Sequence, residues 1–252
     1  MTDLESTALL AIAFFLIALL YSSVGHGGAS AYLGALVLAG YSRPMLAPLV
    51  LTLNLVVTLL GWARFRSAGH FSFELLFPFI VTSIPAAFIG AKFQLSTPFF
   101  STLLALALFC SGLRMFIVLT PVKPLELPPT KWLWKIGPTI GSALGLLAGM
   151  TGIGGGIFLS PILLLLGWAD IKQTAAASAA FIAVNSLSGL SSQLLKGGGD
   201  WSLLLPLGIA VGLGGAIGSW SGALRLQPLV LQRLLGVVLL LAAVKLAHDL
   251  LV

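Results

Sequence analysis

Two glycine-rich segments that interrupt apolar stretches carry the strongest chemical signal in the chain. They are Gly25-His26-Gly27-Gly28 and Gly152-Ile153-Gly154-Gly155-Gly156. Each glycine costs about 1 kcal/mol in a helix relative to alanine, so we expect the helix to unwind at both places. The short apolar stretch after each loop then begins a new helix, whose first N–H groups are unsatisfied and lie at the positive end of the helix dipole. Two such loops facing each other would bind an anion without lysine or arginine.

The alternative is that these glycines only allow helices to pack closely. We assign that role to two other sets with four-residue spacing, Gly141, Gly145 and Gly149, and Gly214, Gly218 and Gly222. Close packing does not require consecutive glycines at matching places, so we favour a functional role for the two loops. A phosphate-binding Walker loop is excluded because no Gly-Lys-Ser/Thr sequence follows, and a dinucleotide-binding fingerprint because no strand precedes.

Several polar side chains near the loops are candidates for the same site. His26 lies inside the first loop, where a titratable group would bind an anion or carry a coupled proton, or else remain neutral and bond to a nearby carbonyl. Asn54 and Asn185 occupy the middle of the next long apolar stretch in each half, where an amide needs a partner. The hydroxyls that border the loops complete the candidate set: Ser22, Ser23 and Thr151.

The composition places these residues in a membrane. Of the 252 residues, 58% are hydrophobic and only 8% are charged, whereas a soluble domain carries about 25% charged residues. A soluble enzyme and a disordered chain are therefore excluded. The net charge of +6 indicates basic loops retained in the cytoplasm rather than nucleic-acid binding. The N-terminus lacks a basic segment, so we expect the first apolar stretch to stay as a membrane helix.

The apolar stretches predict an all-α, polytopic integral membrane protein. Eight are long enough to cross a bilayer, and two shorter ones, Ala29–Ala39 and Ile157–Gly167, suit broken or re-entrant helices. The long stretches are Leu9–Val24, Met45–Ala63, Phe73–Ala91, Phe99–Leu119, Trp132–Met150, Thr174–Leu195, Ser202–Trp220 and Leu229–Leu246.

The two halves of the chain repeat this pattern. The glycine loops lie 127 positions apart, as do Gly40-Tyr41 and Gly167-Trp168, while Asn54 and Asn185 lie 131 apart. We predict a first membrane repeat over 4–120, a proline-rich cytoplasmic linker over 121–130 and a second repeat over 131–250, each repeat with four long helices. Repeats in transporters meet at a substrate site near the bilayer midplane.

Two topologies remain open. If the short segments turn back, the halves are inverted and nine basic residues face inside against four outside. If the short segments continue their helices, the best orientation gives eight against five. The positive-inside rule slightly favours the first.

The segments Tyr21–Ser30 and Gly149–Pro161 resemble the paired motifs of the sulfite exporter TauE/SafE family of permeases. The resemblance covers essentially the whole chain, although the first copy has Ala29 where the full pattern has glycine. It implies a secondary transporter for a small sulfur-containing anion, such as sulfite or an organosulfonate, in the plasma membrane (the bacterial inner membrane). Protons are the simplest coupling ion, because no acidic sodium site is visible.

Other functions find less support in the residues. We expect no enzyme, no cofactor and no metal site, because the chain has three histidines, a lone Cys110 and no carboxylate inside the apolar stretches. The rivals are a non-transporting membrane scaffold or assembly protein and a transporter of another small metabolite. The shortage of intramembrane carboxylates argues against a cation pathway.

Overall fold

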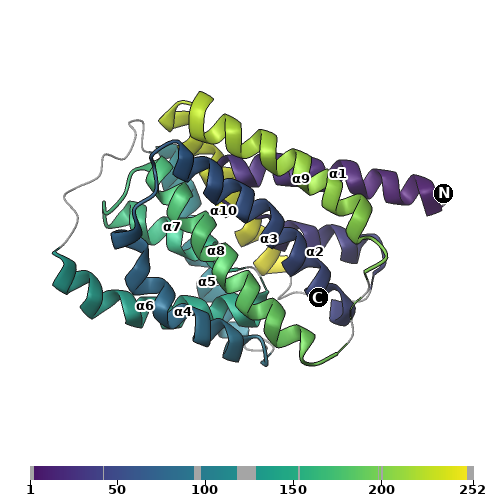
Figure 1. Ribbon diagram of the computed structural model, residues 1–252, viewed down its shortest axis with the longest axis horizontal. Coiled ribbons are helices and arrows are strands. Elements are labelled where there is room, and N and C mark those ends of the chain that lie inside the picture. Colours follow the sequence, from purple (N-terminus) through teal and green to yellow (C-terminus); the bar gives the residue numbers. More distant parts are fainter. Residues whose placement is uncertain are drawn as a thin grey trace.

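Every regular element in the computed structural model is a helix. The structure describes residues 3–41, 43–93, 98–117, 129–152, 154–197, 199 and 201–248. Within them are eight long helices and two of ten residues, and α9 continues into one π-helical turn, η1 (Figure 1). The bounds are α1 Asp3–Ser23, α2 Ala29–Leu38, α3 Arg43–Ser67, α4 Phe73–Gly90, α5 Pro98–Ile117, α6 Thr130–Thr151, α7 Gly156–Leu165, α8 Ile171–Leu194, α9 Leu204–Trp220, η1 Ser221–Arg225 and α10 Pro228–His248.

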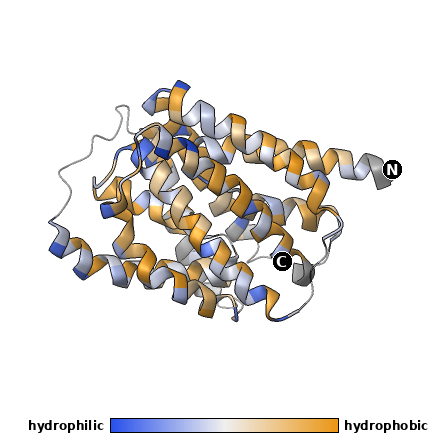
Figure 2. Ribbon diagram, viewed as in Figure 1, coloured by the Kyte–Doolittle hydropathy of each residue, from blue (hydrophilic) through white to orange (hydrophobic). Residues whose placement is uncertain are grey.

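The surface of the helices is apolar, as a bilayer requires. Large side chains such as Leu9, Leu205 and Val244 are more than half exposed, and apolar residues cover the outward faces of the helices (Figure 2). Six described helices are long and apolar enough to span a membrane: α1, α3, α4, α8, α9 with η1, and α10. The predicted all-helical, polytopic membrane protein is confirmed, including the two short helices.

The turns recur at matching positions in the two halves. Among the described residues, four pairs of glycines have a positive φ at offsets of 127 or 130 residues. These pairs are Gly25 and Gly152, Gly28 and Gly155, Gly40 and Gly167, and Gly69 and Gly199. Since such a φ is rarely adopted by other residues, the backbone changes direction at the same points in both halves. This supports the predicted repeats, although their limits at 4–120 and 131–250 stay predictions and residues 118–128 of the linker region lie outside the described residues.

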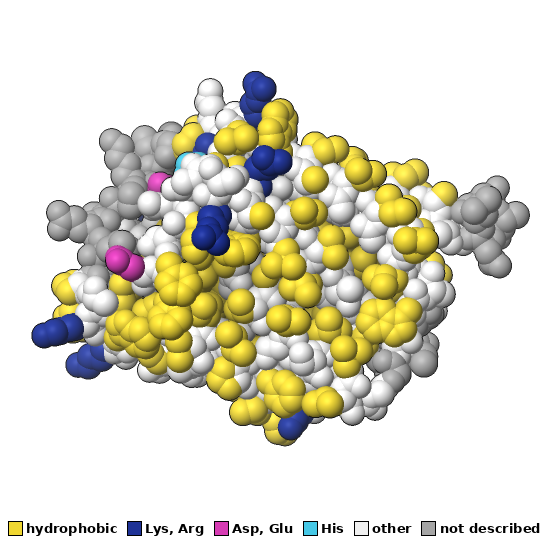
Figure 3. All heavy atoms as spheres, in the orientation of Figure 1, with side chains coloured by type: hydrophobic (Ala, Val, Ile, Leu, Met, Phe, Trp, Pro, Cys, Tyr) yellow, Lys and Arg dark blue, Asp and Glu magenta, His cyan; other side chains and the backbone are white. Residues whose placement is uncertain are grey.

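The two halves run in opposite directions through the molecule. Helix α8, the counterpart of α3, packs antiparallel to it: Leu51 lies beside Gly189, and Gly61 lies beside Ala179. Helix α1 ends where Gly25 meets Ala175 near the start of α8. Because α3 begins at the other end, α2 must turn back, which is the first of the two predicted topologies (Figure 1). Most basic side chains visible in Figure 3 lie on the side away from the start of α1.

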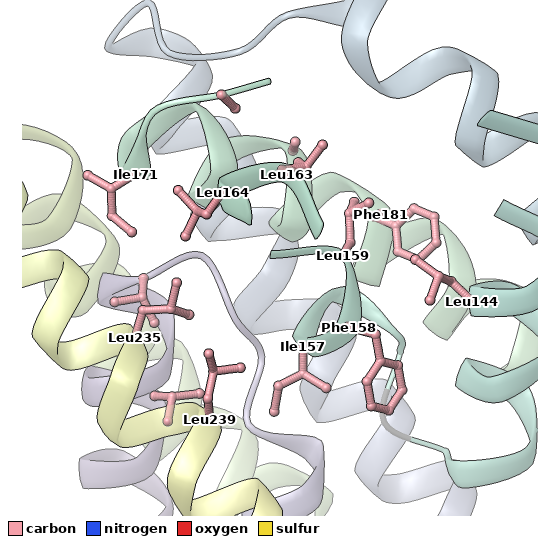
Figure 4. Packing of buried hydrophobic residues seen from close by; sticks show 14 of the residues in the cluster. Leu144, Ile157, Phe158, Leu159, Leu163, Leu164, Ile171, Phe181, Leu235 and Leu239 are labelled. Carbon is pink, nitrogen blue, oxygen red and sulfur yellow. The ribbon is translucent and has the colours of Figure 1, made fainter. Parts of the chain in front are cut away.

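The short helix α7 lies inside the protein rather than at its surface. Ile157, Phe158 and Leu159 are at most 5% exposed and pack among residues of α6, α8 and α10 (Figure 4). Leu144 and Phe181 belong to the same cluster. The loop before α7 is therefore surrounded by protein, the condition under which irregular backbone is tolerated at membrane depth.

Helices of one half also pack against helices of the other. Helix α6 of the second half packs on α4 of the first, and α9 of the second half packs on α1 of the first. Both contacts use the glycines with four-residue spacing, which touch backbone carbonyls of the facing helix. The predicted packing role of Gly141, Gly145, Gly149, Gly214, Gly218 and Gly222 is confirmed.

We predict that Gly145→Val destabilises the protein, because its Cβ would overlap the backbone of Ser83 on α4. Overpacking of this kind costs about 1–3 kcal/mol. The thermal midpoint of the detergent-solubilised protein should therefore fall. Gly212→Ala is the control, since a Cβ at Gly212 meets nothing within 4 Å. Equal thermal midpoints for the two variants would show that the contact between α4 and α6 has room for the added side chain.

Candidate functional site

The two glycine loops begin the two short helices in the same way. Gly28 precedes α2 with φ 91°, and Gly155 precedes α7 with φ 76°. A glycine at this position has no side chain to cap the first N–H groups of the helix. Gly27, Gly28, Gly154, Gly155 and Gly156 are all buried. Both helices therefore present the positive ends of their dipoles to the protein interior.

Asn54 on α3 lies between the two loops and contacts both. Its Oδ1 accepts a hydrogen bond of 3.2 Å from Ala29 N, the first residue of α2. Its Nδ2 donates a 2.8 Å bond to Ser186 Oγ on α8. A Cβ on Gly27 would overlap Oδ1, and one on Gly154 would lie 3.0 Å from Nδ2. The predicted meeting of the loops is thus present in the geometry, with one amide at its centre.

His26 links the first loop to the second half of the chain. Its Nδ1 lies 3.0 Å from Val24 O, and because a carbonyl only accepts, this nitrogen carries the proton. Its Nε2 lies 3.3 Å from Ser160 Oγ on α7. Ser160 Oγ in turn lies 2.7 Å from Ser178 Oγ on α8. Gly156 O lies 3.1 Å from the same Ser160 Oγ, so the hydroxyl proton is directed either at Nε2 of neutral His26 or at Gly156 O. Protonated His26 would instead donate from Nε2 to Ser160 Oγ, which leaves the hydroxyl proton for Gly156 O.

The space between the loops is closed in this conformation. A cavity of about 10 Å3 is lined by residues of the first loop together with Tyr21, Ser30, Ile157 and Ile182. That volume holds about one water molecule, so an oxyanion such as sulfite requires the loops to separate. The hydroxyls of Tyr21 and Ser30 are bonded to each other beside it.

Comparison with known proteins agrees with this architecture. The family model described as "Sulfite exporter TauE/SafE" matches residues 10–246. The chain belongs to this family. It is 35% identical over 243 residues to "Probable membrane transporter protein y4hK" of Sinorhizobium fredii (strain NBRC 101917 / NGR234), covering 94% of this chain and 96% of that protein. It is also 28% identical over 115 residues to "Probable membrane transporter protein YunE" of Bacillus subtilis (strain 168), covering 46% and 42%. No solved structure matches the chain.

Membership of this family makes the protein a multi-pass membrane transporter and not an enzyme. In the transporter, the candidate residues divide into two groups. Gly27 and Gly154 come together at Asn54, and His26 lies beside Gly27 in the first loop. Gly25 lies instead against Ala175 of α8, and a Cβ at Gly152 would meet nothing within 4 Å. Asn185 is buried on α8, the neighbour of α3. Ile153, the counterpart of His26, lies outside the described residues.

The candidate hydroxyls are bonded elsewhere. Ser22 Oγ donates to Gly215 O on α9, Ser23 Oγ to Leu20 O, and Thr151 Oγ1 to Leu147 O. Ser160 and Ser178 contribute more directly to the site, because they connect His26 to α8. Two sequence signals point to Ser160: it lies one turn after the second glycine loop, and it falls within the segment Gly149–Pro161 that resembles the family motif.

The buried polar groups of the site are neutral amides, hydroxyls and one imidazole. No lysine, arginine or carboxylate side chain is buried in the part of the chain that the structure describes. Within that part, no three His, Cys, Asp or Glu side chains approach one another as metal ligands would. While His26 is neutral, an anion held here would be stabilised by dipoles rather than by a full positive charge.

We predict that Asn54→Leu lowers stability, because it leaves Ala29 N–H and Ser186 Oγ without the partner that Asn54 provides. Each such buried group costs about 1–3 kcal/mol. Thermal unfolding of the purified protein measures the change. Thr52→Val on the same helix is the control, because the Thr52 hydroxyl bonds only to Pro48 O within its own helix. A loss no larger than in the control would contradict a bridging role for Asn54.

Proposed function

We propose that the protein is a permease that moves a small sulfur-containing anion, such as sulfite or an organosulfonate, across the plasma membrane. The observation that carries the proposal is the meeting of two glycine loops, each at the start of a buried helix, on the amide of Asn54. The binding residues are the loop glycines Gly25, Gly27, Gly28, Gly152, Gly154, Gly155 and Gly156 with His26, Asn54 and Asn185, and with Ser22, Ser23 and Thr151 at the border.

The chemistry of the site suits an oxyanion better than a cation. Helix N-termini present N–H donors and roughly half a positive charge each, and amide and hydroxyl groups add further donors. Such a site neutralises the anion without the cost of burying a lysine or arginine in hydrocarbon. A cation would instead need carbonyls or carboxylates directed at it.

Movement of the halves against each other would open the site. The halves are inverted, and in transporters of that construction one repeat or bundle moves against the other around a fixed site. Because the present cavity holds about one water molecule, this conformation is a closed one. Opening toward either side requires the loops to separate at Asn54.

His26 is the group that would couple transport to protons. It is 2% exposed and sits in the loop itself, and the cavity beside it is lined by one other titratable side chain, Tyr21. Protonation would give the site a positive charge when the anion is bound, and the Ser160 hydroxyl would turn to accept from Nε2.

Uptake of labelled sulfite and of organosulfonates into proteoliposomes, with and without a pH gradient, tests the proposal. We expect Gly27→Leu and Gly154→Leu to abolish transport while the protein still inserts, since side chains there displace the Asn54 amide. Gly27→Ala and Gly212→Ala form a matched pair for the uptake assay, because the first adds a methyl group inside the site and the second adds the same group outside it. If no anion crosses the membrane under any gradient, the proposal that the protein transports anions is refuted. If a different metabolite crosses instead, the proposed substrate is wrong.

For His26 we expect the pH dependence of uptake to disappear in His26→Ala. His26→Gln should behave in the same way while keeping a hydrogen-bonding side chain, so it separates loss of titration from loss of packing. Initial rates across a pH series in proteoliposomes give the profile. His70→Ala, outside the site, should leave it unchanged. A wild-type profile in both His26 variants would remove the residue from the coupling mechanism.

A further inference from the structure

Helix α8 carries a row of buried polar side chains along one face. Thr174, Ser178, Asn185 and Ser192 follow one another at spacings of four, seven and seven residues, which place them on one side of a helix. All four are at most 2% exposed. At 1.5 Å per residue the row is about 27 Å long, close to the roughly 30 Å thickness of the hydrocarbon core. We call these four residues the α8 row.

Three of the four members of the α8 row lack the hydrogen-bond partners that buried polar groups normally have. Thr174 Oγ1, both amide atoms of Asn185 and Ser192 Oγ have no hydrogen-bond partner among the described residues. They account for four of the six such buried atoms in that part of the chain. Each unpaired group costs about 1–3 kcal/mol, so the row does not serve stability. By contrast, Ser188 and Gln193 on the same helix bond to carbonyls of α4 and the turn after it.

Helix α3, the counterpart of α8 in the first half, does not carry an equivalent of the α8 row. The equivalent positions on α3 are Arg43, Ala47, Asn54 and Gly61. Among those of the four whose side chains the structure describes, Asn54 is the one buried polar residue, and its amide is bonded to both Ala29 and Ser186. The two symmetry-related asparagines therefore differ in environment: Asn54 joins the loops, and Asn185 has free donors and acceptors.

The α8 row is connected to the loops through its second member. Ser178 Oγ lies 2.7 Å from Ser160 Oγ, which lies 3.3 Å from His26 Nε2. The row thus passes the site at Ser178 and continues past it toward both ends of α8. It lies on the most buried of the six candidate spans.

We propose that the α8 row lines the route along which the anion crosses the membrane, with Asn185 as its central contact. The hydroxyls and the amide replace water around the anion at successive depths, in steps of about 6 to 10 Å. Thr174, Asn185 and Ser192 have no hydrogen-bond partner among the described residues, which leaves their polar atoms available to the solute. The proposal rests on the proposed function and extends it from the site between the loops to the path on either side.

The two asparagines provide a matched test. Asn185→Leu removes unpaired polar atoms, so we expect an unchanged or higher thermal midpoint together with at least a tenfold loss of uptake. Asn54→Leu should lower the midpoint, for the reason given above. Normal uptake in Asn185→Leu would overturn the proposal. A fall in midpoint as large as that of Asn54→Leu would do so too, because it would show that Asn185 has a structural partner.

Cysteine labelling tests the route without assuming the substrate. In a Cys110→Ser background, Thr174→Cys, Asn185→Cys and Ser192→Cys are each treated with an anionic, sulfonate-bearing methanethiosulfonate reagent in open membrane fragments. Ala176→Cys and Ala179→Cys, also buried but off the face of the row, are the controls. We expect the row to be labelled about tenfold faster than the controls, because only it becomes wet as the transporter opens. Methanesulfonate should protect Asn185→Cys.

The outcomes separate this proposal from the proposed function. Equal labelling of the row and the controls overturns the route, whatever the transporter carries. Selective labelling of the row without transport of any sulfur-containing anion supports the route and refutes the proposed substrate. Sulfite transport with an unlabelled row refutes the route and leaves the proposed function standing.

Discussion

The bilayer interior offers no water to backbone N–H and carbonyl groups, and this constraint governs the whole structure. Each group must find a partner within the protein, so a chain that breaks its helices must hide the breaks. The breaks before α2 and α7 are hidden between α3 and α8, and Asn54 satisfies the first N–H group of α2 there. Burial of the breaks also brings the positive dipole ends of α2 and α7 to the protein interior.

Much of this arrangement is predictable from the sequence because it depends on local chemistry. Glycines at 25–28 and 152–156 break helices wherever they occur, and glycines spaced by four on α6 and α9 allow backbones to touch. The direction of α2 and α7 was open from charge counting alone. It is decided by long-range packing, the contact of Gly25 with Ala175 and the antiparallel course of α3 and α8.

Other features of the site depend on contacts that a sequence does not show. His26 and Ser160 are 134 residues apart, and nothing local marks them as neighbours. Asn54 and Asn185 occupy equivalent places in the repeat, yet among the described residues Asn54 has hydrogen-bond partners and the amide of Asn185 has none. The sequence repeat predicts equal roles for the pair, whereas the packing around them has diverged. Under the proposed route, such divergence lets one half hold the loops together through Asn54 while the other contacts the solute through Asn185.

The packing of helices of one half against helices of the other has a consequence for how such a protein arises. Because α1 packs on α9 and α4 packs on α6, the glycine-lined faces of the second half are buried only against helices of the first half. To bury such faces, a chain of half this length would have to pair with a second copy inserted in the opposite orientation. An ancestor that inserted both ways round and dimerised would meet that need. Fusion of two such genes then fixes the orientation of each copy, after which the two asparagines are free to specialise.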